Sequence, residues 1–137
     1  MKIDSYTMLK YAFVFGAIVD GTIAISWLLI ASGLSIPNIL NGHVGNGEDY
    51  QLAMFIAAMF LLGWGVILAW GSINPVERRG VLIITAVFLL ISVALEVMFF
   101  SDILGGGWFI FGVSKRIFLI ILFSTAYFHS FIKPNNQ

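Results

Sequence analysis

The sequence predicts an all-α integral membrane protein with four transmembrane helices in an up-and-down antiparallel bundle. Its composition is 60% hydrophobic and 10% charged, and its mean hydropathy is +0.99. Soluble domains carry about 25% charged residues, so this is the composition of a membrane protein. Four apolar segments are separated by polar or glycine-rich breaks, and each is long enough to cross a bilayer. A chain of 137 residues is expected to form one transmembrane domain over its whole length.

The four predicted spans cover residues 9–33, 51–71, 75–100 and 112–132. The first is followed by a loop that contains Pro37, glycines and asparagines, which favour turns over a continued helix. The third is predicted to begin with Asn74 as its cap, Pro75 at the first helical position and Glu77 close to a capping box. The glycines at 105–107 are predicted to end the third helix. Short connections between hydrophobic helices favour the up-and-down arrangement.

The positive charges predict how the spans are oriented. One side of the bundle collects Lys2, Lys10, Arg78, Arg79 and Lys133. The first loop, on the other side, contains no lysine or arginine, although Lys115 and Arg116 begin the fourth span there. Because cytoplasmic loops carry the excess of basic residues, we expect a multi-pass protein of the cell membrane with both termini cytoplasmic.

Several function classes are disfavoured by composition and motifs. The seven basic and seven acidic residues balance, whereas a nucleic-acid partner requires a basic face. The absence of cysteine from the sequence excludes disulfides, thiolate metal sites and cysteine nucleophiles. No GxSxG, HExxH, Walker or dinucleotide-binding motif occurs in the sequence. His129 is expected to form a hydrogen bond at the membrane interface, because no partner residue has metal-ligand spacing. We therefore predict no cofactor, no metal and no catalytic residue.

Asp20 lies near the middle of the first span, where an ionised group is most costly. Gly16 and Ala24 lie four residues away on either side, so the carboxylate is expected to point into the bundle. If it stays unpaired, it is expected to exchange a proton or a cation. An arginine from the fourth span could instead reach it.

The third and fourth spans supply the other charged candidates. In the third span, Thr85, Ser92 and Glu96 form one polar stripe. Glu96 is at a depth similar to that of Lys115 and Arg116, so we expect an ion pair from Glu96 to one of these two bases.

Three functions remain open at this stage. The first is binding or transport of a small lipophilic or cationic ligand at a cluster of Asp20, Glu96, Lys115 and Arg116. The second is a structural or accessory membrane subunit, in which these charges only fix the packing of the helices. The third is an enzyme on a lipid-soluble substrate that uses Asp20 or Glu96 as an acid or base. The expected partners are the lipid bilayer and a second copy of the chain, since four helices enclose little volume.

The segment GAIVDGTIAI, residues 16–25, resembles the first helix of the small multidrug-resistance transporters. In that family a glutamate precedes a glycine-threonine pair, and the chains have a similar length and number of spans. Here the acid is Asp20, its spacing to the pair differs and the outer loop is longer. The resemblance covers ten residues and implies transport by analogy alone, without assigning the chain to the family.

Overall fold

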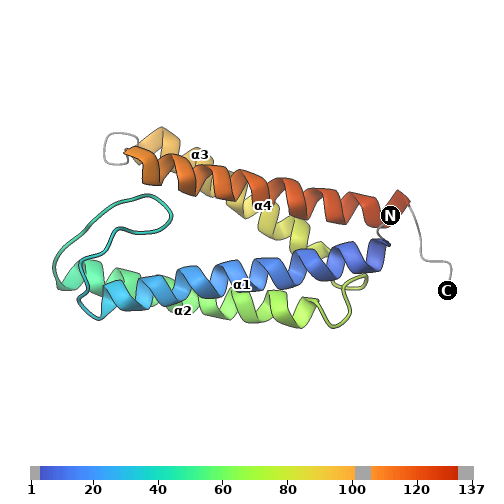
Figure 1. Cartoon of the computed structure of the whole chain (residues 1–137), viewed down its shortest axis with the longest axis horizontal. Coiled ribbons are helices and arrows are strands. Elements are labelled where there is room, and N and C mark those ends of the chain that lie inside the picture. Colours follow the sequence, from blue (N-terminus) through green and yellow to red (C-terminus); the bar gives the residue numbers. More distant parts are fainter. Residues whose placement is uncertain (1–3, 101–105, 133–137) are drawn as a thin grey trace.

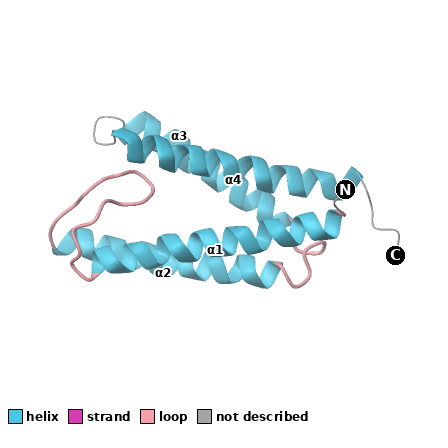
Figure 2. Ribbon diagram, viewed as in Figure 1, coloured by secondary structure: helices cyan, strands magenta, loops and turns pink. Residues whose placement is uncertain are grey.

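The structure is a computed structural model that describes residues 4–100 and 106–132. Within these residues it contains four helices, all long and apolar enough to span a membrane (Figure 1). Their bounds are Ser5–Ala31 for α1, Glu48–Gly71 for α2, Gly80–Phe100 for α3 and Gly106–Ile132 for α4. Every other described segment is loop or turn (Figure 2). The prediction of an all-helical chain with four helices long enough to span is therefore confirmed.

The start of α3 differs from the prediction, because the helix begins at Gly80 and not at Pro75. The residues between form a turn in which the Arg78 N–H donates to the Asn74 carbonyl at 3.2 Å. The Asn74 side chain donates to Glu77 Oε2 at 3.4 Å, so the predicted capping residues contact each other instead of capping α3. The residues before Gly80 stay in this turn because Arg78 and Arg79 contact other helices. The helix therefore begins at Gly80, although glycine has a low helix propensity.

Two arginines make those contacts. The Arg78 guanidinium lies 3.5 Å from the ring centroid of Trp70 and donates to its carbonyl at the end of α2. Arg79 lies 3.8 Å from the ring centroid of Phe131 and donates to Ser130 Oγ at 3.3 Å, near the end of α4. This connection is therefore held by cation–π and hydrogen-bond contacts to both neighbouring helices.

The start of α4 also differs from the prediction. Gly106 and Gly107 belong to α4, so the prediction that these two glycines end the third helix is wrong, while Gly105 lies outside the described residues. Apolar residues follow at once, and Trp108 packs against Gly42 of the loop between α1 and α2. Tertiary packing here outweighs the low helix propensity of glycine.

The helices pack in pairs, α1 against α2 and α3 against α4, and α1 also packs against α4 (Figure 1). The buried core is apolar and draws on all four helices: Leu9, Ala12, Phe13, Leu68, Leu82, Ala86, Leu119, Phe123 and Ala126. Gly16 lies where α1, α2 and α4 meet, since a methyl group there would lie 2.8 Å from the Phe123 ring and 3.1 Å from Leu68. This glycine lets the three helices approach closely.

The start of α1 lies beside the end of α4. Ser5 Oγ is 3.2 Å from His129 Nδ1, so the expected hydrogen-bonding role of His129 is confirmed. From this end the two helix pairs diverge, and the loop between α1 and α2 extends toward α4 at the opposite end (Figure 1).

The outer faces of the helices carry large apolar side chains. Phe60 on α2 is 77% exposed, and Phe88 on α3 and Phe118 on α4 are also exposed. In water such surfaces would promote aggregation, whereas in a bilayer they contact lipid. The four apolar helices are therefore those of a multi-pass membrane protein.

Candidate functional site

An ion pair joins α3 to α4. Arg116 Nη2 lies 2.7 Å from Glu96 Oε2, which confirms the expected pairing of Glu96 with a base of the fourth span and identifies that base as Arg116. Within residues 4–100 and 106–132 it is the only ion pair shorter than 4.0 Å. The distance is that of a charge-assisted hydrogen bond, so each side chain neutralises the other.

Arg116 is the more buried partner of this pair. The residue is 3% exposed, whereas the Glu96 side chain is 23% exposed. Arg116 Nε also donates to the Gly112 carbonyl one turn earlier in α4, at 3.2 Å. Two of its donors are thus committed to fixed partners, so its guanidinium is not directed to Asp20.

Asp20 is half-buried on the face of α1 that packs against α2. A methyl group placed on Gly65 would lie 3.6 Å from Asp20 Cβ and 3.6 Å from the Ala17 carbonyl oxygen. In the described part of the chain, the Asp20 carboxylate has no hydrogen bond and no ion pair. It is the one acid of the predicted cluster without a direct partner.

Lys115 is the base that interacts with Asp20. The charges of Lys115 and Asp20 act on each other across more than 4.0 Å, and the neighbouring Arg116 charge acts on Lys115 as well. Lys115 is half-buried, and its Nζ atom lies 5.8 Å from the ring centroid of Phe111. The structure therefore separates the four predicted residues into two sets. Glu96 and Arg116 form a direct ion pair, whereas Asp20 and Lys115 have neither a hydrogen bond nor an ion pair in the described part of the chain.

The other polar residues of the predicted stripe on α3 have local partners. Thr85 Oγ1 donates to the Val81 carbonyl at 2.7 Å and accepts from Trp64 Nε1 of α2 at 3.2 Å. Ser92 Oγ donates to the Leu89 carbonyl at 2.8 Å. These two hydroxyls satisfy backbone and side-chain groups and do not join the charged cluster.

Sequence reasoning missed Asn38, which organises the loop between α1 and α2. This buried residue accepts a hydrogen bond from Trp27 Nε1 at 3.1 Å and one from the Leu40 N–H at 2.9 Å. Its carbonyl accepts from the Gly42 N–H at 2.7 Å. Asparagine is a frequent turn residue because its side chain can bond to nearby backbone, and only that signal was present in the sequence.

The loop reaches the start of α4 next to the ion pair. A methyl group on Gly112 would overlap the Leu40 carbonyl, and one on Gly42 would lie 2.7 Å from Trp108 Cβ. Gly112 therefore accepts the hydrogen bond from Arg116 Nε and also contacts Leu40 of the loop.

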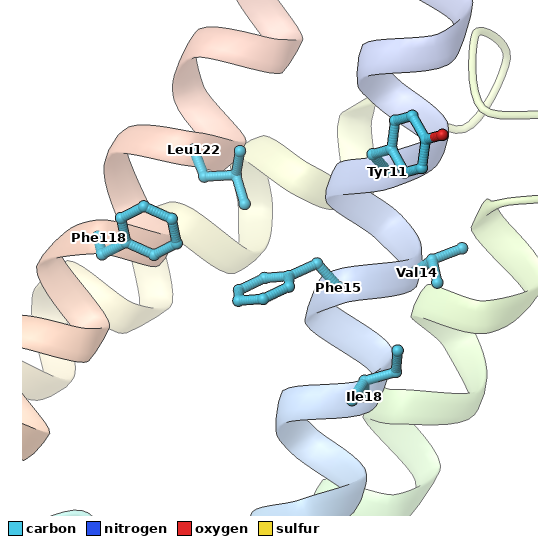
Figure 3. A pocket seen from close by; sticks show the side chains of 6 residues that line it. All are labelled: Tyr11, Val14, Phe15, Ile18, Phe118 and Leu122. Carbon is cyan, nitrogen blue, oxygen red and sulfur yellow. The ribbon is translucent and has the colours of Figure 1, made fainter.

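An apolar groove of about 420 Å³ lies between α1 and α4 (Figure 3). It is lined by Tyr11, Val14, Phe15, Ile18, Phe118 and Leu122. The rings of Phe15 and Phe118 meet edge to face across it, with centroids 5.9 Å apart. Its lining residues are apolar apart from Tyr11, so it suits a hydrocarbon chain.

In the described part of the chain, no group of three or more histidine, aspartate or glutamate side chains is placed to hold a metal ion. Comparisons with known protein families, with curated proteins and with solved structures found no match.

Proposed function

We propose that the protein is a multi-pass protein of the cell membrane that binds or transports a small lipophilic or cationic ligand at the cluster of Asp20, Glu96, Lys115 and Arg116. Its four helices would form an up-and-down antiparallel bundle with both termini in the cytoplasm. The observation that carries this proposal is the unpaired Asp20 carboxylate, which has no hydrogen bond and no ion pair within residues 4–100 and 106–132. Ionisable groups in spanning helices are costly, so an unpaired one is a functional candidate.

The charge balance of the cluster supports a role for Asp20 in ligand binding. Glu96 and Arg116 neutralise each other at 2.7 Å, which leaves Asp20 as the acid free to accept a cation or a proton. In a medium of low dielectric constant, a ligand charge beside this carboxylate is attracted more strongly than it would be in water.

Binding of ethidium, a fluorescent lipophilic cation, tests the proposal. The protein is reconstituted in nanodiscs, and its binding is compared with that of Asp20→Asn. We expect saturable binding that weakens by about tenfold in this variant, the loss of one charge contact. The matched control is Asp49→Asn, which removes an exposed carboxylate at the start of α2 and should leave binding unchanged. Equal binding by both variants would contradict a ligand role for Asp20.

The proposed orientation has its own test, because the chain contains no cysteine and single cysteines can be introduced. A membrane-impermeant maleimide should label Asn46→Cys, in the loop between α1 and α2, on intact cells. It should label Glu77→Cys only after the membrane is opened. The reverse pattern would place the termini outside, against the distribution of basic residues.

A second candidate function is that of a structural or accessory membrane subunit. The Glu96–Arg116 pair favours it, because a buried pair with two committed partners fixes the register of α3 against α4. If Asp20→Asn lowers thermal stability and no probe binds the unmodified protein, this second function is the better account. A second copy of the chain remains a proposed partner, and the mass of the protein in nanodiscs tests it.

A further inference from the structure

The turn between α2 and α3 joins two spanning helices, so it lies at a surface of the membrane. It extends from the end of α2 at Gly71 to the start of α3 at Gly80, at the end of the molecule where α1 begins (Figure 1). Backbone outside a helix is not stable among lipid tails, because its N–H and C=O groups would lack partners there. Arg78 and Arg79, the last two residues of the turn, therefore lie at the level of the lipid headgroups.

Apolar side chains are exposed in and beside the same turn. Ile73 is 65% exposed and Val76 is 39% exposed, while Trp70 at the end of α2 is 51% exposed. Tryptophan is enriched at membrane interfaces, where its ring contacts both lipid tails and headgroups. These exposed residues favour lipid over a soluble acidic protein as the partner of the two arginines.

Both guanidinium groups are held in place without being neutralised. Arg78 stacks on the ring of Trp70 and donates to its carbonyl, and Arg79 stacks on Phe131 and donates to Ser130 Oγ. Aromatic rings and neutral oxygens position a guanidinium but leave it with its full positive charge. Each of the two side chains makes one hydrogen bond within the described residues, although a guanidinium has five N–H donors. Further donors are therefore available to an anion.

No carboxylate of the described residues pairs with either arginine. Glu77 is adjacent in the sequence, but it accepts a hydrogen bond from the Asn74 side chain at 3.4 Å and forms no ion pair shorter than 4.0 Å. Arg116, by contrast, is paired with Glu96 at 2.7 Å. Two of the three arginines of the chain thus have no acidic partner in the part that the structure describes.

We propose that the turn between α2 and α3 binds anionic phospholipids, with one lipid phosphate at Arg78 and another at Arg79. The planar fork of a guanidinium matches the oxygens of a phosphate. The two side chains diverge, one to α2 and the other to α4, so they offer two separate contacts. Anionic lipids are concentrated in the cytoplasmic leaflet, which this turn faces in the proposed orientation. This surface is distinct from the proposed ligand site at Asp20.

Competition between two lipids with the same acyl chains tests the inference. The purified protein in detergent is equilibrated with equal amounts of phosphatidylglycerol and phosphatidylcholine, and native mass spectrometry measures the ratio of the two bound lipids. We expect phosphatidylglycerol to be preferred by about fivefold or more, the contribution of one arginine near an anionic surface. Arg78→Gln and Arg79→Gln should each lower this preference, and the double variant should remove most of it.

Lys10→Gln is the matched control. Lys10 is an exposed base near the start of α1, at the same end of the molecule, and within the described residues it stacks on no aromatic ring. The substitution removes the same charge as either glutamine variant of an arginine. It should leave the preference for phosphatidylglycerol largely unchanged, because the lysine is not held in position.

Replacing both arginines with lysine separates the guanidinium from its charge. Arg78→Lys with Arg79→Lys keeps the net charge and allows the contacts with the rings of Trp70 and Phe131, so this variant is expected to fold. Lysine is a point charge without the planar fork, so the preference should be smaller than that of the unmodified protein. The preference of the unmodified protein is itself independent of the folding of any variant.

Three results would overturn the inference. The first is equal binding of the two lipids by the unmodified protein, which would leave the arginines to an acidic protein. The second is a loss in Lys10→Gln as large as that in the arginine variants, since attraction by charge in general would then be sufficient. The third is an undiminished preference in the double lysine variant, which would exclude the guanidinium contacts.

Discussion

Arg116 Nη2 lies 2.7 Å from Glu96 Oε2, and the same arginine donates through Nε to the carbonyl of Gly112. Because Gly112 supports Leu40 of the loop between α1 and α2, the ion pair is connected to the loop through a single residue. The end of the molecule where the helix pairs diverge is thus held by a hydrogen-bonded arginine and a close backbone contact (Figure 1). Asp20 and Lys115 are not part of this connection.

Glu96→Gln should destabilise the protein, because it leaves the Arg116 charge buried without its counter-ion. Removing one partner of a buried pair costs about 3–5 kcal/mol, and we expect a smaller loss here because the Glu96 side chain is 23% exposed. Thermal unfolding in detergent measures the change. Glu48→Gln, at an exposed acid in the first turn of α2, is the control. The double variant Glu96→Gln, Arg116→Met should recover most of the loss, and a further loss would show that the pair is not the cause.

Gly112→Ala should displace the loop from α4, because the added methyl group overlaps the Leu40 carbonyl. Overpacking against backbone costs about 1–3 kcal/mol. Protease digestion of the loop between α1 and α2 should become faster, and the fluorescence of Trp108 should change. Gly107→Ala is the matched control, since this glycine of α4 has open space around it and alanine favours the helix. If both variants behave alike, the loop does not rest on Gly112.

Asn38→Ala should loosen the same loop by a different route. The substitution leaves the Trp27 indole N–H and the Leu40 N–H without their acceptor, and a buried donor without a partner costs about 1–3 kcal/mol. Unfolding experiments and the emission of Trp27 should both register the change. Asn46→Ala, at an exposed position of the same loop, should change neither. Stability equal to that of the unmodified protein would show that water replaces the Asn38 oxygen.

Hydrophobicity alone was enough to predict the four helices. Each is a long apolar run, and a bilayer leaves helices as the only way for one segment to satisfy its own backbone. The boundaries were harder to predict, because the start of α3 depends on what Arg78 and Arg79 contact outside their own segment. A local capping signal at Asn74 could not reveal those contacts.

The candidate site was likewise predictable where position along a helix was sufficient, and unpredictable where contacts between segments decide. Depth along the helices was enough to predict an ion pair from Glu96, since both partners lie at known distances from the ends of their spans. Which base would bond to Glu96 depended on the rotation of α4, which the sequence does not specify to better than one residue. The role of Asn38 is tertiary as well, because its partner Trp27 belongs to another segment.

Two glycines on facing helices should respond to alanine in opposite ways. At Gly16 a methyl group would lie 2.8 Å from the Phe123 ring, closer than real contacts allow, so Phe123 or Leu68 must move. We expect Gly16→Ala to destabilise the protein by about 1–3 kcal/mol despite the gain in helix propensity. At Gly65 the nearest atoms would lie at 3.6 Å, an ordinary contact, so Gly65→Ala should be neutral or stabilising by up to about 1 kcal/mol. Thermal unfolding of both variants in one detergent compares them directly. Equal destabilisation would mean that α1 packs as closely on α2 at Gly65 as it does on α4 at Gly16, against the distances in the structure.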